Sequence, residues 1–330
     1  MIKMKHWTEP SGIFLMHIPL HWKYLNPITS SPEEKAPYSF QAGADSIFYF
    51  QISSYPIEDF IHNTTEYEIY KSEKTMWMES RADTTDYCCH LFNGKLSDQV
   101  IIGKLIYDIE HKECEHINSQ LETFMKVLDS IIIIPAKDRK LASDFDKLER
   151  LTHALAASQD LLNTAITSDA HIQTIAVCAN QIDAYLRLGI IISKQLAMKT
   201  DDLDTKYLFQ ADNEKGLLEK VIFCHALDNR VISKELYDEL VDLYGQRNKV
   251  IHRYIISNIK TYDLSKIAFN YINATEKVRK ILSELEDKQA NCEYGIYGKK
   301  FNRASTSDPN AINRLFSNVN EKHMINTFQR

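Results

Sequence analysis

One short stretch of the chain combines side chains that can act on a phosphate group. Residues 243–255 read LYGQRNKVIHRYI, which places an arginine, an amide and a histidine at Arg247, Asn248 and His252. Arginine is a permanent cation with a rigid fork of donors, and histidine gains or loses a proton near neutral pH. This combination can stabilise negative charge on a phosphate and also move a proton.

On a helix, the arginine of this stretch falls in the middle of an apolar arc. At about 100° per residue, Ile251 and Tyr254 lie within about 40° of Arg247. A buried cation without a partner is costly, so something must compensate for its charge. One interpretation is a buried salt bridge, for instance to Asp183 or Glu239, beside a histidine that is satisfied in the core. The other interpretation is a functional site.

The spacing of these residues resembles a known motif. Arg247-Asn248-x3-His252 is similar to the Arg-x4–6-His signature of the HEPN superfamily, in which a polar residue often follows the arginine. The longer form that ends at Tyr254 resembles the Arg-x4-His-x-Tyr motif of HEPN toxins encoded with minimal nucleotidyltransferases. The motif is expected to open the fourth of about five helices. The resemblance covers about residues 170–285 and implies an all-α HEPN-like bundle.

The resemblance further implies RNA cleavage that needs no metal and no other cofactor. HEPN ribonucleases typically act as homodimers, in which the Arg/His pairs of two protomers meet across the two-fold axis. On a regular helix Arg247 and His252 are about 140° apart, too divergent to hold one phosphate within a single chain. Two copies facing each other would supply both groups to one shared groove.

In this scheme each residue of the motif has a role. His252 removes the proton of a ribose 2′-hydroxyl or protonates the leaving 5′-oxygen, and Arg247 stabilises charge on the phosphate. Asn248 orients the phosphate or the imidazole. The expected products are 2′,3′-cyclic phosphate and 5′-hydroxyl ends, so DNA should survive. The expected RNA partner is a tRNA or an mRNA.

Three neighbouring residues each have two interpretations. Lys249 and Arg253 flank the motif and either hold RNA phosphates or are ordinary solvated charges. Tyr254 matches the tyrosine to which an antitoxin nucleotidyltransferase attaches AMP in the paired toxins, or it is an interface tyrosine. The chain has no nucleotidyltransferase signature of its own, so an enzyme that modifies Tyr254 would be a separate partner protein.

The composition is that of an ordinary globular protein. The 330 residues include 45 acidic and 39 basic side chains, a net charge of −6, which argues against indiscriminate coating of nucleic acid. Six cysteines are too sparse for a disulfide scaffold. We expect a cytoplasmic protein without a membrane partner, because no secretory signal and no apolar run of about 18–20 residues is apparent. Cys88-Cys89-His90 and the histidines and cysteine of 111–116 match no common zinc pattern.

Residues 1–135 have the pattern of an α+β domain, an antiparallel sheet with one late helix. The helix is expected over His116–Leu128, and turn chemistry occurs at Asn93-Gly94. The expected strands are Gly12–Ile18, Ser46–Ser53, Thr75–Glu79, Tyr87–Phe92 and Gln99–Ile109. The arrangement resembles a PsbP-like sandwich. This domain is a candidate sensor or docking surface for a partner.

The remainder of the chain is helical in pattern and ends in a tail. Residues 136–155 are a connecting segment, either a linker or a solvated helix, and 156–287 form the bundle. Ser233 is expected to cap a helix. The expected helices are Ala170–Lys199, Asn213–Leu227, Lys234–Tyr244, Arg247–Ile259 and Leu264–Glu286. The Asn-rich, mildly basic tail over 288–330 is either an ordered cover or a mobile arm.

Three functions follow from these observations. The first is a metal-independent HEPN endoribonuclease that acts as a toxin or an antiviral-defence effector. The second is a non-catalytic HEPN module that dimerises or scaffolds a defence or toxin–antitoxin complex. The third, a plain helical adaptor unrelated to HEPN, is favoured if Arg247 is paired with an acid inside one chain.

Overall fold

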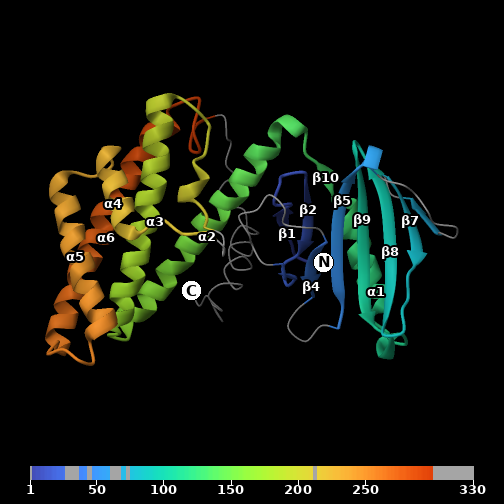
Figure 1. Cartoon of the computed structure of the whole chain (residues 1–330), viewed down its shortest axis with the longest axis horizontal. Coiled ribbons are helices and arrows are strands. Elements are labelled where there is room, and N and C mark those ends of the chain that lie inside the picture. Colours follow the sequence, from blue (N-terminus) through green and yellow to red (C-terminus); the bar gives the residue numbers. More distant parts are fainter. Residues whose placement is uncertain are drawn as a thin grey trace. The chain divides into compact units, whose positions relative to one another are not determined.

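The computed structural model describes residues 2–26, 37–42, 47–59, 68–71, 75–210 and 214–299. The chain divides between Asp146 and Lys147 into two units, an N-terminal antiparallel sheet unit and a helical unit (Figure 1). This confirms the predicted fold class, an α+β domain followed by an all-α bundle. The division falls inside the 136–155 segment, where a single helix, α2 (Arg139–Thr167), runs through the boundary.

Within its described residues, the first unit contains two antiparallel sheets. The smaller has the order β1-β2-β10 and the larger has the order β3-β4-β5-β9-β8-β7-β6. The strands are β1 (Met4–Thr8), β2 (Phe14–Pro19), β3 (Lys23–Tyr24), β4 (Tyr38–Gln41), β5 (Tyr49–Pro56), β6 (Glu68–Lys71), β7 (Met76–Arg81), β8 (Tyr87–Leu96), β9 (Gln99–Asp108) and β10 (Ile132–Ile133).

The predicted late helix is present as α1 (Ile117–Asp129), and it covers one face of the larger sheet (Figure 1). Its buried side chains Phe124 and Leu128 lie over Gly103 of β9, where an added Cβ would come within 3.0 Å of both. Trp22 stacks on Phe50 of β5 with ring centroids 4.0 Å apart. Alternating apolar residues on the strands and the apolar stripe of the helix therefore close one aromatic-rich core.

The turn predicted at Asn93-Gly94 is wrong. Both residues lie inside β8, where Gly94 pairs with Trp77 of β7 and with Ile101 of β9. The chain reverses further on, at Ser97, which has a φ of 53°. Gly94 is needed for packing, because a Cβ at this position would lie 2.5 Å from the Trp77 ring. A tertiary contact therefore overrides the local turn preference of Asn-Gly.

Two glycine substitutions should change stability in opposite directions. Gly94→Ala should lower the free energy of unfolding by about 1–3 kcal/mol, because the methyl group overpacks the indole. Gly245→Ala should raise it by about 0.5–1 kcal/mol, because Gly245 is helical and an added Cβ would meet nothing within 4 Å. Denaturant titration of the full chain measures both. Equal stabilities for Gly94→Ala and wild type would contradict the close contact with Trp77.

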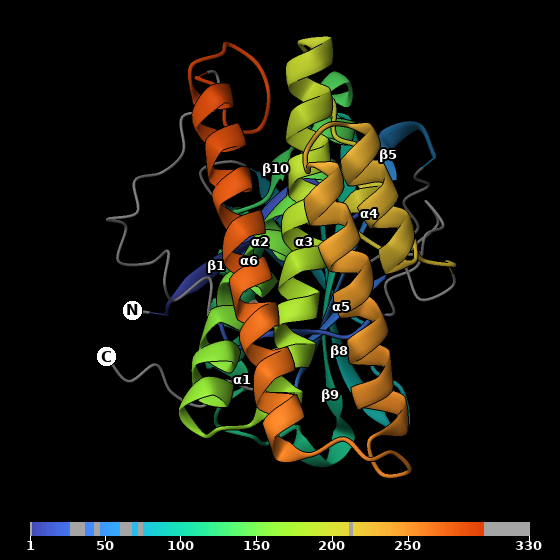
Figure 2. The same ribbon diagram turned by 90° about the vertical axis from the view of Figure 1, so that its left-hand side faces the viewer.

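The second unit is a bundle of long helices, shown in Figure 2. Besides α2 it contains α3 (His171–Met198), α4 (Glu219–Asp228), α5 (Lys234–Arg253) and α6 (Thr261–Ala290). Figure 2 shows α3 between α6 and α5. The helix α3 is long and apolar enough to cross a membrane, although no such apolar run is apparent in the sequence. However, 72% of its most apolar window is buried in the bundle.

Some helices of the bundle begin where the sequence predicts, and others do not. Ser233 caps α5 as predicted, because its hydroxyl accepts a bond from the Leu236 amide at 3.3 Å. The two helices predicted over 234–244 and 247–259 are one helix instead, and α4 begins at Glu219 rather than at Asn213, which lies outside the described residues. Gly245 does not break α5, because flanking apolar residues such as Leu243 are buried against the bundle.

The first part of the predicted tail packs on α3. Buried Gln195 of α3 and Gln289 of α6 bond to each other at 3.0 Å, and each accepts a backbone N–H from the segment after α6. The donors are Ile296 at 3.2 Å and Tyr297 at 2.9 Å. Residues up to 299 thus form an ordered cover on the bundle. The rest of the tail, 300–330, lies outside the described residues.

Candidate functional site

The residues of the motif lie on the last two turns of α5 and directly after it. The motif therefore ends a helix rather than opening one, which corrects the prediction. Arg247 and Asn248 are half-buried, and the proposed RNA-binding residues and His252 are exposed. The side chains of Lys249, His252 and Arg253 have no hydrogen-bond partner among the described residues, which leaves these side chains available to a ligand.

Arg247 and His252 lie on the same helix, but their side chains do not converge on one point within a single chain. They are five positions apart, which on a regular helix is about 7.5 Å along the axis and about 140° around it. His252 and Arg253 occupy the last turn of α5, where the partial negative charge of the helix end favours cations. Tyr254 is the C-terminal cap and is partly exposed.

Arg247 has an acidic partner within the chain. Its Nη2 donates to Oε2 of Glu219 on α4 at 2.6 Å, and its guanidinium lies 5.0 Å from the centre of the Tyr244 ring. The acid is neither of the two named from the sequence: Asp183 binds Arg187 at 2.5 Å, and Glu239 binds Lys277 at 2.7 Å. The Arg247 and Glu219 side chains are 22% and 15% exposed, so the pair is largely removed from water.

This ion pair belongs to a larger buried polar cluster. Burial raises the pKa of the Glu219 carboxyl, and the nearby Asp183 raises it further against the opposing effect of Arg247. Burial likewise raises the pKa of Asp183 and of Tyr271 on α6. Among the described residues, Arg247 Nε, Asp183 Oδ1 and the Tyr271 hydroxyl have no hydrogen-bond partner. Several ionisable side chains therefore lie close together at a place in the bundle that few water molecules reach.

The apolar arc around Arg247 is only partly buried. Leu243 and Val250 are in the core, whereas Ile251 and Tyr254 are exposed. The exposed apolar side chains continue past the end of α5 and into α6. We call the following six residues the α5–α6 tip: Ile251, Tyr254, Ile255 (93% exposed), Ile256 (83%), Tyr262 (79%) and Phe269 (62%). Such a concentration of exposed apolar side chains is typical of an interaction surface.

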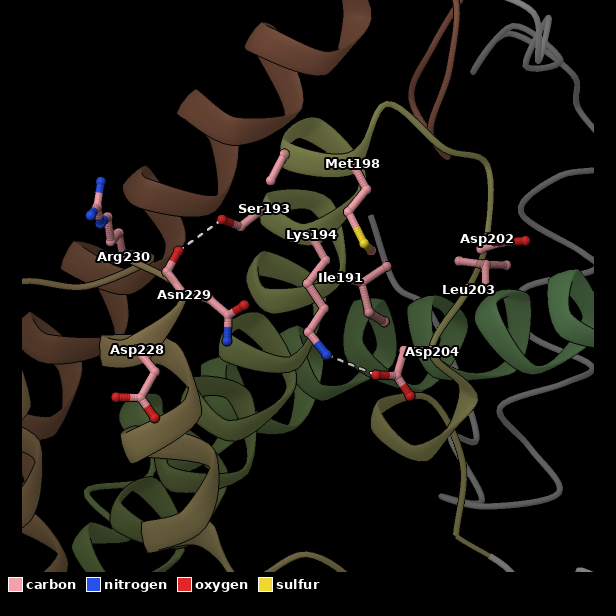
Figure 3. Close-up of a pocket in the computed structure, with 11 residues that line it drawn as sticks. Ile191, Ser193, Lys194, Met198, Asp202, Leu203, Asp204, Asp228, Asn229 and Arg230 are labelled. Atoms are coloured by element: carbon pink, nitrogen blue, oxygen red, sulfur yellow. Dashed lines mark hydrogen bonds and ion pairs between the residues drawn. The ribbon is translucent and has the colours of Figure 1, made fainter.

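A separate cavity of about 740 Å³ lies at the C-terminal end of α3 (Figure 3). Lys194 faces Asp204 across it at 2.8 Å, and the Ser193 hydroxyl donates to the Asn229 carbonyl at 2.8 Å. Met198 lines its upper side in the view of Figure 3. No local sequence pattern indicates this cavity, because its walls come from α3, from 202–204 and from 228–230.

A buried polar network in the first unit was also missed. His90 bonds through Nδ1 to Glu79 at 2.5 Å and through Nε2 to the Tyr107 hydroxyl at 3.1 Å, and Arg81 also contacts the ring. Both ring nitrogens are thus occupied by protein partners. No group of three or more histidine, cysteine, aspartate or glutamate side chains in the described part of the chain is arranged to hold a metal.

The chain is distantly similar to solved structures. No family model matches the chain, and no curated protein matches it. A solution structure of cyanobacterial PsbP from Synechocystis sp. PCC 6803 matches with a TM-score of 0.29 and 8% identity, over 41% of this chain and 94% of that chain. A crystal structure of a protein from Bacteroides thetaiotaomicron VPI-5482 matches with a TM-score of 0.33 and 11% identity, over 70% of this chain and 80% of that one.

Proposed function

We propose that the helical unit is a metal-independent endoribonuclease of the HEPN type that works as a homodimer and acts as a toxin or antiviral-defence effector. The observation that supports this best is the placement of the motif. Arg247, Asn248 and His252 lie on the final turns of α5 beside the exposed α5–α6 tip. A two-fold contact through the tip would bring two copies of the motif to one groove.

The chemistry needs only the side chains of this helix end. His252, exposed to solvent, takes the proton from a ribose 2′-hydroxyl or delivers one to the 5′-oxygen. Arg247 of either protomer stabilises the charge that develops on the phosphate, and Asn248 orients the phosphate or the imidazole. Lys249 and Arg253, both exposed, hold neighbouring RNA phosphates. The 2′-hydroxyl attack leaves 2′,3′-cyclic phosphate and 5′-hydroxyl ends.

The partners follow from the same proposal. The substrate is a tRNA or an mRNA, and a cytoplasmic setting supplies both. Tyr254, partly exposed at the end of α5, is accessible to a separate nucleotidyltransferase antitoxin that would attach AMP next to the catalytic pair. The first unit serves as a sensor or as a docking surface for a defence partner.

The direct test is cleavage of labelled tRNA and mRNA by the purified full chain in EDTA. We expect cleavage to persist in EDTA and the fragments to carry cyclic phosphate and 5′-hydroxyl ends. An otherwise identical DNA strand should remain intact, because it lacks the attacking hydroxyl. Cleavage that stops in EDTA, or fragments with 5′-phosphate ends, would contradict the proposed mechanism.

A second function is favoured by the Arg247–Glu219 ion pair. A guanidinium neutralised inside its own chain is the condition that favours a plain helical adaptor unrelated to HEPN over a site that binds phosphate. In that case the α5–α6 tip binds a partner and the motif has no chemical role. Absence of cleavage of every RNA tested, together with intact dimerisation, would support this second function.

A further inference from the structure

Glu219 holds the Nη2 donor of Arg247, a donor of the kind that binds phosphate oxygens. Its Oε2 lies 2.6 Å from Arg247 Nη2, a short charge-assisted bond of the same kind that arginine makes with a phosphate oxygen. The two side chains are only 15–22% exposed, so little water is present to weaken the attraction between the carboxylate and the guanidinium. A phosphate that binds this guanidinium must therefore share it with the carboxylate or displace the carboxylate.

We propose that Glu219 is an internal competitor of RNA at Arg247, so that the site holds a phosphodiester firmly only when this carboxylate releases the guanidinium. The proposal rests on the role of Arg247 given above and adds how that site is regulated. In this proposal, the chain in which Arg247 and Glu219 are paired is a resting state with low affinity for RNA.

The charges around the site support this state. Glu219 offsets Arg247, and Asp183 offsets Arg187 on α3, so the cluster offers no net positive charge to an approaching anion. The guanidinium is also incompletely used: Nε has no partner among the described residues. Arginine has five N–H donors, so a guanidinium freed from Glu219 offers Nη2 to a phosphate, whereas Nε stays buried.

The same surroundings allow a fall in pH to break the Arg247–Glu219 ion pair. Burial, reinforced by Asp183, raises the pKa of Glu219, so this carboxyl takes up a proton at a higher pH than an ordinary glutamate. As the pH falls through that raised pKa, the competing charge disappears while Arg247 stays cationic. The groups on the helices packed around the carboxylate are Arg247 and Tyr244 on α5, Asp183 and Arg187 on α3, and Tyr271 on α6.

The first test measures RNA binding without cleavage. The probe is a fluorescent 2′-O-methyl oligouridine, which has no attacking hydroxyl and no base that titrates between pH 5 and 7.5. Glu219→Gln keeps the size of the side chain and removes its charge. Its matched control is Glu239→Gln, which makes the same change in net charge on α5 by opening an exposed pair with Lys277.

At pH 7.5 and constant salt, Glu219→Gln should bind the probe about threefold to tenfold more tightly than wild type, and Glu239→Gln should bind it as wild type does. The salt dependence of log K should steepen by about 0.7, the value of one additional phosphate contact to a single strand. Adding Arg247→Ala to Glu219→Gln should remove the gain. Equal or weaker binding by Glu219→Gln, or a gain that survives Arg247→Ala, would overturn the proposal.

A second measurement keeps Glu219 in place and varies the pH. In a His252→Ala background, which removes the histidine of the motif, affinity should rise as the pH falls from 7.5 to 5. The rise should exceed that of the Arg247→Ala/His252→Ala chain. It should persist but move to lower pH when Asp183→Asn is added, because Asp183 then no longer raises the pKa of Glu219. Identical pH profiles with and without Arg247 would overturn the proposal even if Glu219→Gln does not fold.

Failure of this inference differs from failure of the proposed ribonuclease. A chain that cuts unmodified RNA through Arg247 and His252, but shows no effect of Glu219→Gln on probe binding, retains the ribonuclease and loses the competitor. A chain that cuts no RNA, yet binds the probe more tightly after Glu219→Gln, retains the competitor and loses the ribonuclease.

Discussion

Replacing His252 by alanine is expected to slow RNA cleavage by about a hundredfold or more, because a positioned acid or base contributes about that factor. Arg247→Ala should slow it by a similar or larger factor, because the charge on the phosphate then loses its donor. His252→Ala should keep the fold and the dimer, because His252 is exposed. Arg247→Ala leaves the Glu219 carboxylate without its partner, so this variant should be less stable, and its folding is checked by circular dichroism before rates are compared. Initial rates on a labelled tRNA in EDTA measure the effect.

Two matched substitutions serve as controls for this experiment. His171→Ala removes a histidine at the start of α3, and Arg230→Ala removes an arginine at the turn between α4 and α5. Neither should change the rate, because neither belongs to the motif. If His252→Ala and Arg247→Ala cut RNA as fast as wild type, the assignment of the catalytic pair is wrong. If wild type is inert as well, the dimerisation module becomes the better proposal.

The second large effect concerns the α5–α6 tip. A double variant, Ile255→Asp and Ile256→Asp, should weaken the homodimer by about a hundredfold or more, because two carboxylates would be buried in an apolar contact. The monomer should remain folded, since both side chains are almost fully exposed in the single chain. Sedimentation equilibrium over a concentration series measures the dissociation constant, and cleavage should fall as the dimer is lost.

Met198→Asp is the matched control for the tip. Met198 is another exposed apolar residue, but it lies at the opposite end of the bundle from the turn between α5 and α6 (Figure 2). Its replacement should leave the dissociation constant unchanged. A double variant that dimerises as wild type does would show that the tip is not the interface.

A groove shared by two protomers predicts that two inactive variants restore activity to each other when they are mixed. Arg247→Ala and His252→Ala chains, each nearly inactive alone, should regain activity when mixed, because a heterodimer has one intact arginine and one intact histidine facing each other. The recovery should be absent when both chains also carry the tip substitutions. Mixing without any recovery, while heterodimers form, would place the two groups of one site in a single chain.

Local sequence patterns predicted much of the architecture. The apolar stripe over Ala170–Lys199 predicted a helix that the structure places at His171–Met198, and short runs of aromatic and β-branched residues predicted strands that became β8 and β9. These predictions succeed because the helical period and the strand preference of such runs are set by neighbours along the chain. Ser233 succeeds for the same reason, since a cap bonds an amide three residues away.

The errors came where distant residues decide the local structure. Asn93-Gly94 has the composition of a turn, yet the Trp77 ring requires a glycine inside a strand. The stretch from 234 to 253 was divided at Gly245, yet packing against the bundle carries one helix through it. In both cases a contact formed only in the folded chain outweighs a local preference of about 1 kcal/mol.

For the site, the sequence by itself determined which residue types stand close together on one helix, an arginine, an amide and a histidine, but not that they stand at the end of that helix. It also required a partner for the half-buried cation. Only the tertiary structure decided that this partner is Glu219, one of 45 acidic side chains, because the choice depends on α4 lying against α5. Periodicity is a property of consecutive residues, whereas an ion pair between residues 28 positions apart is a property of how helices pack.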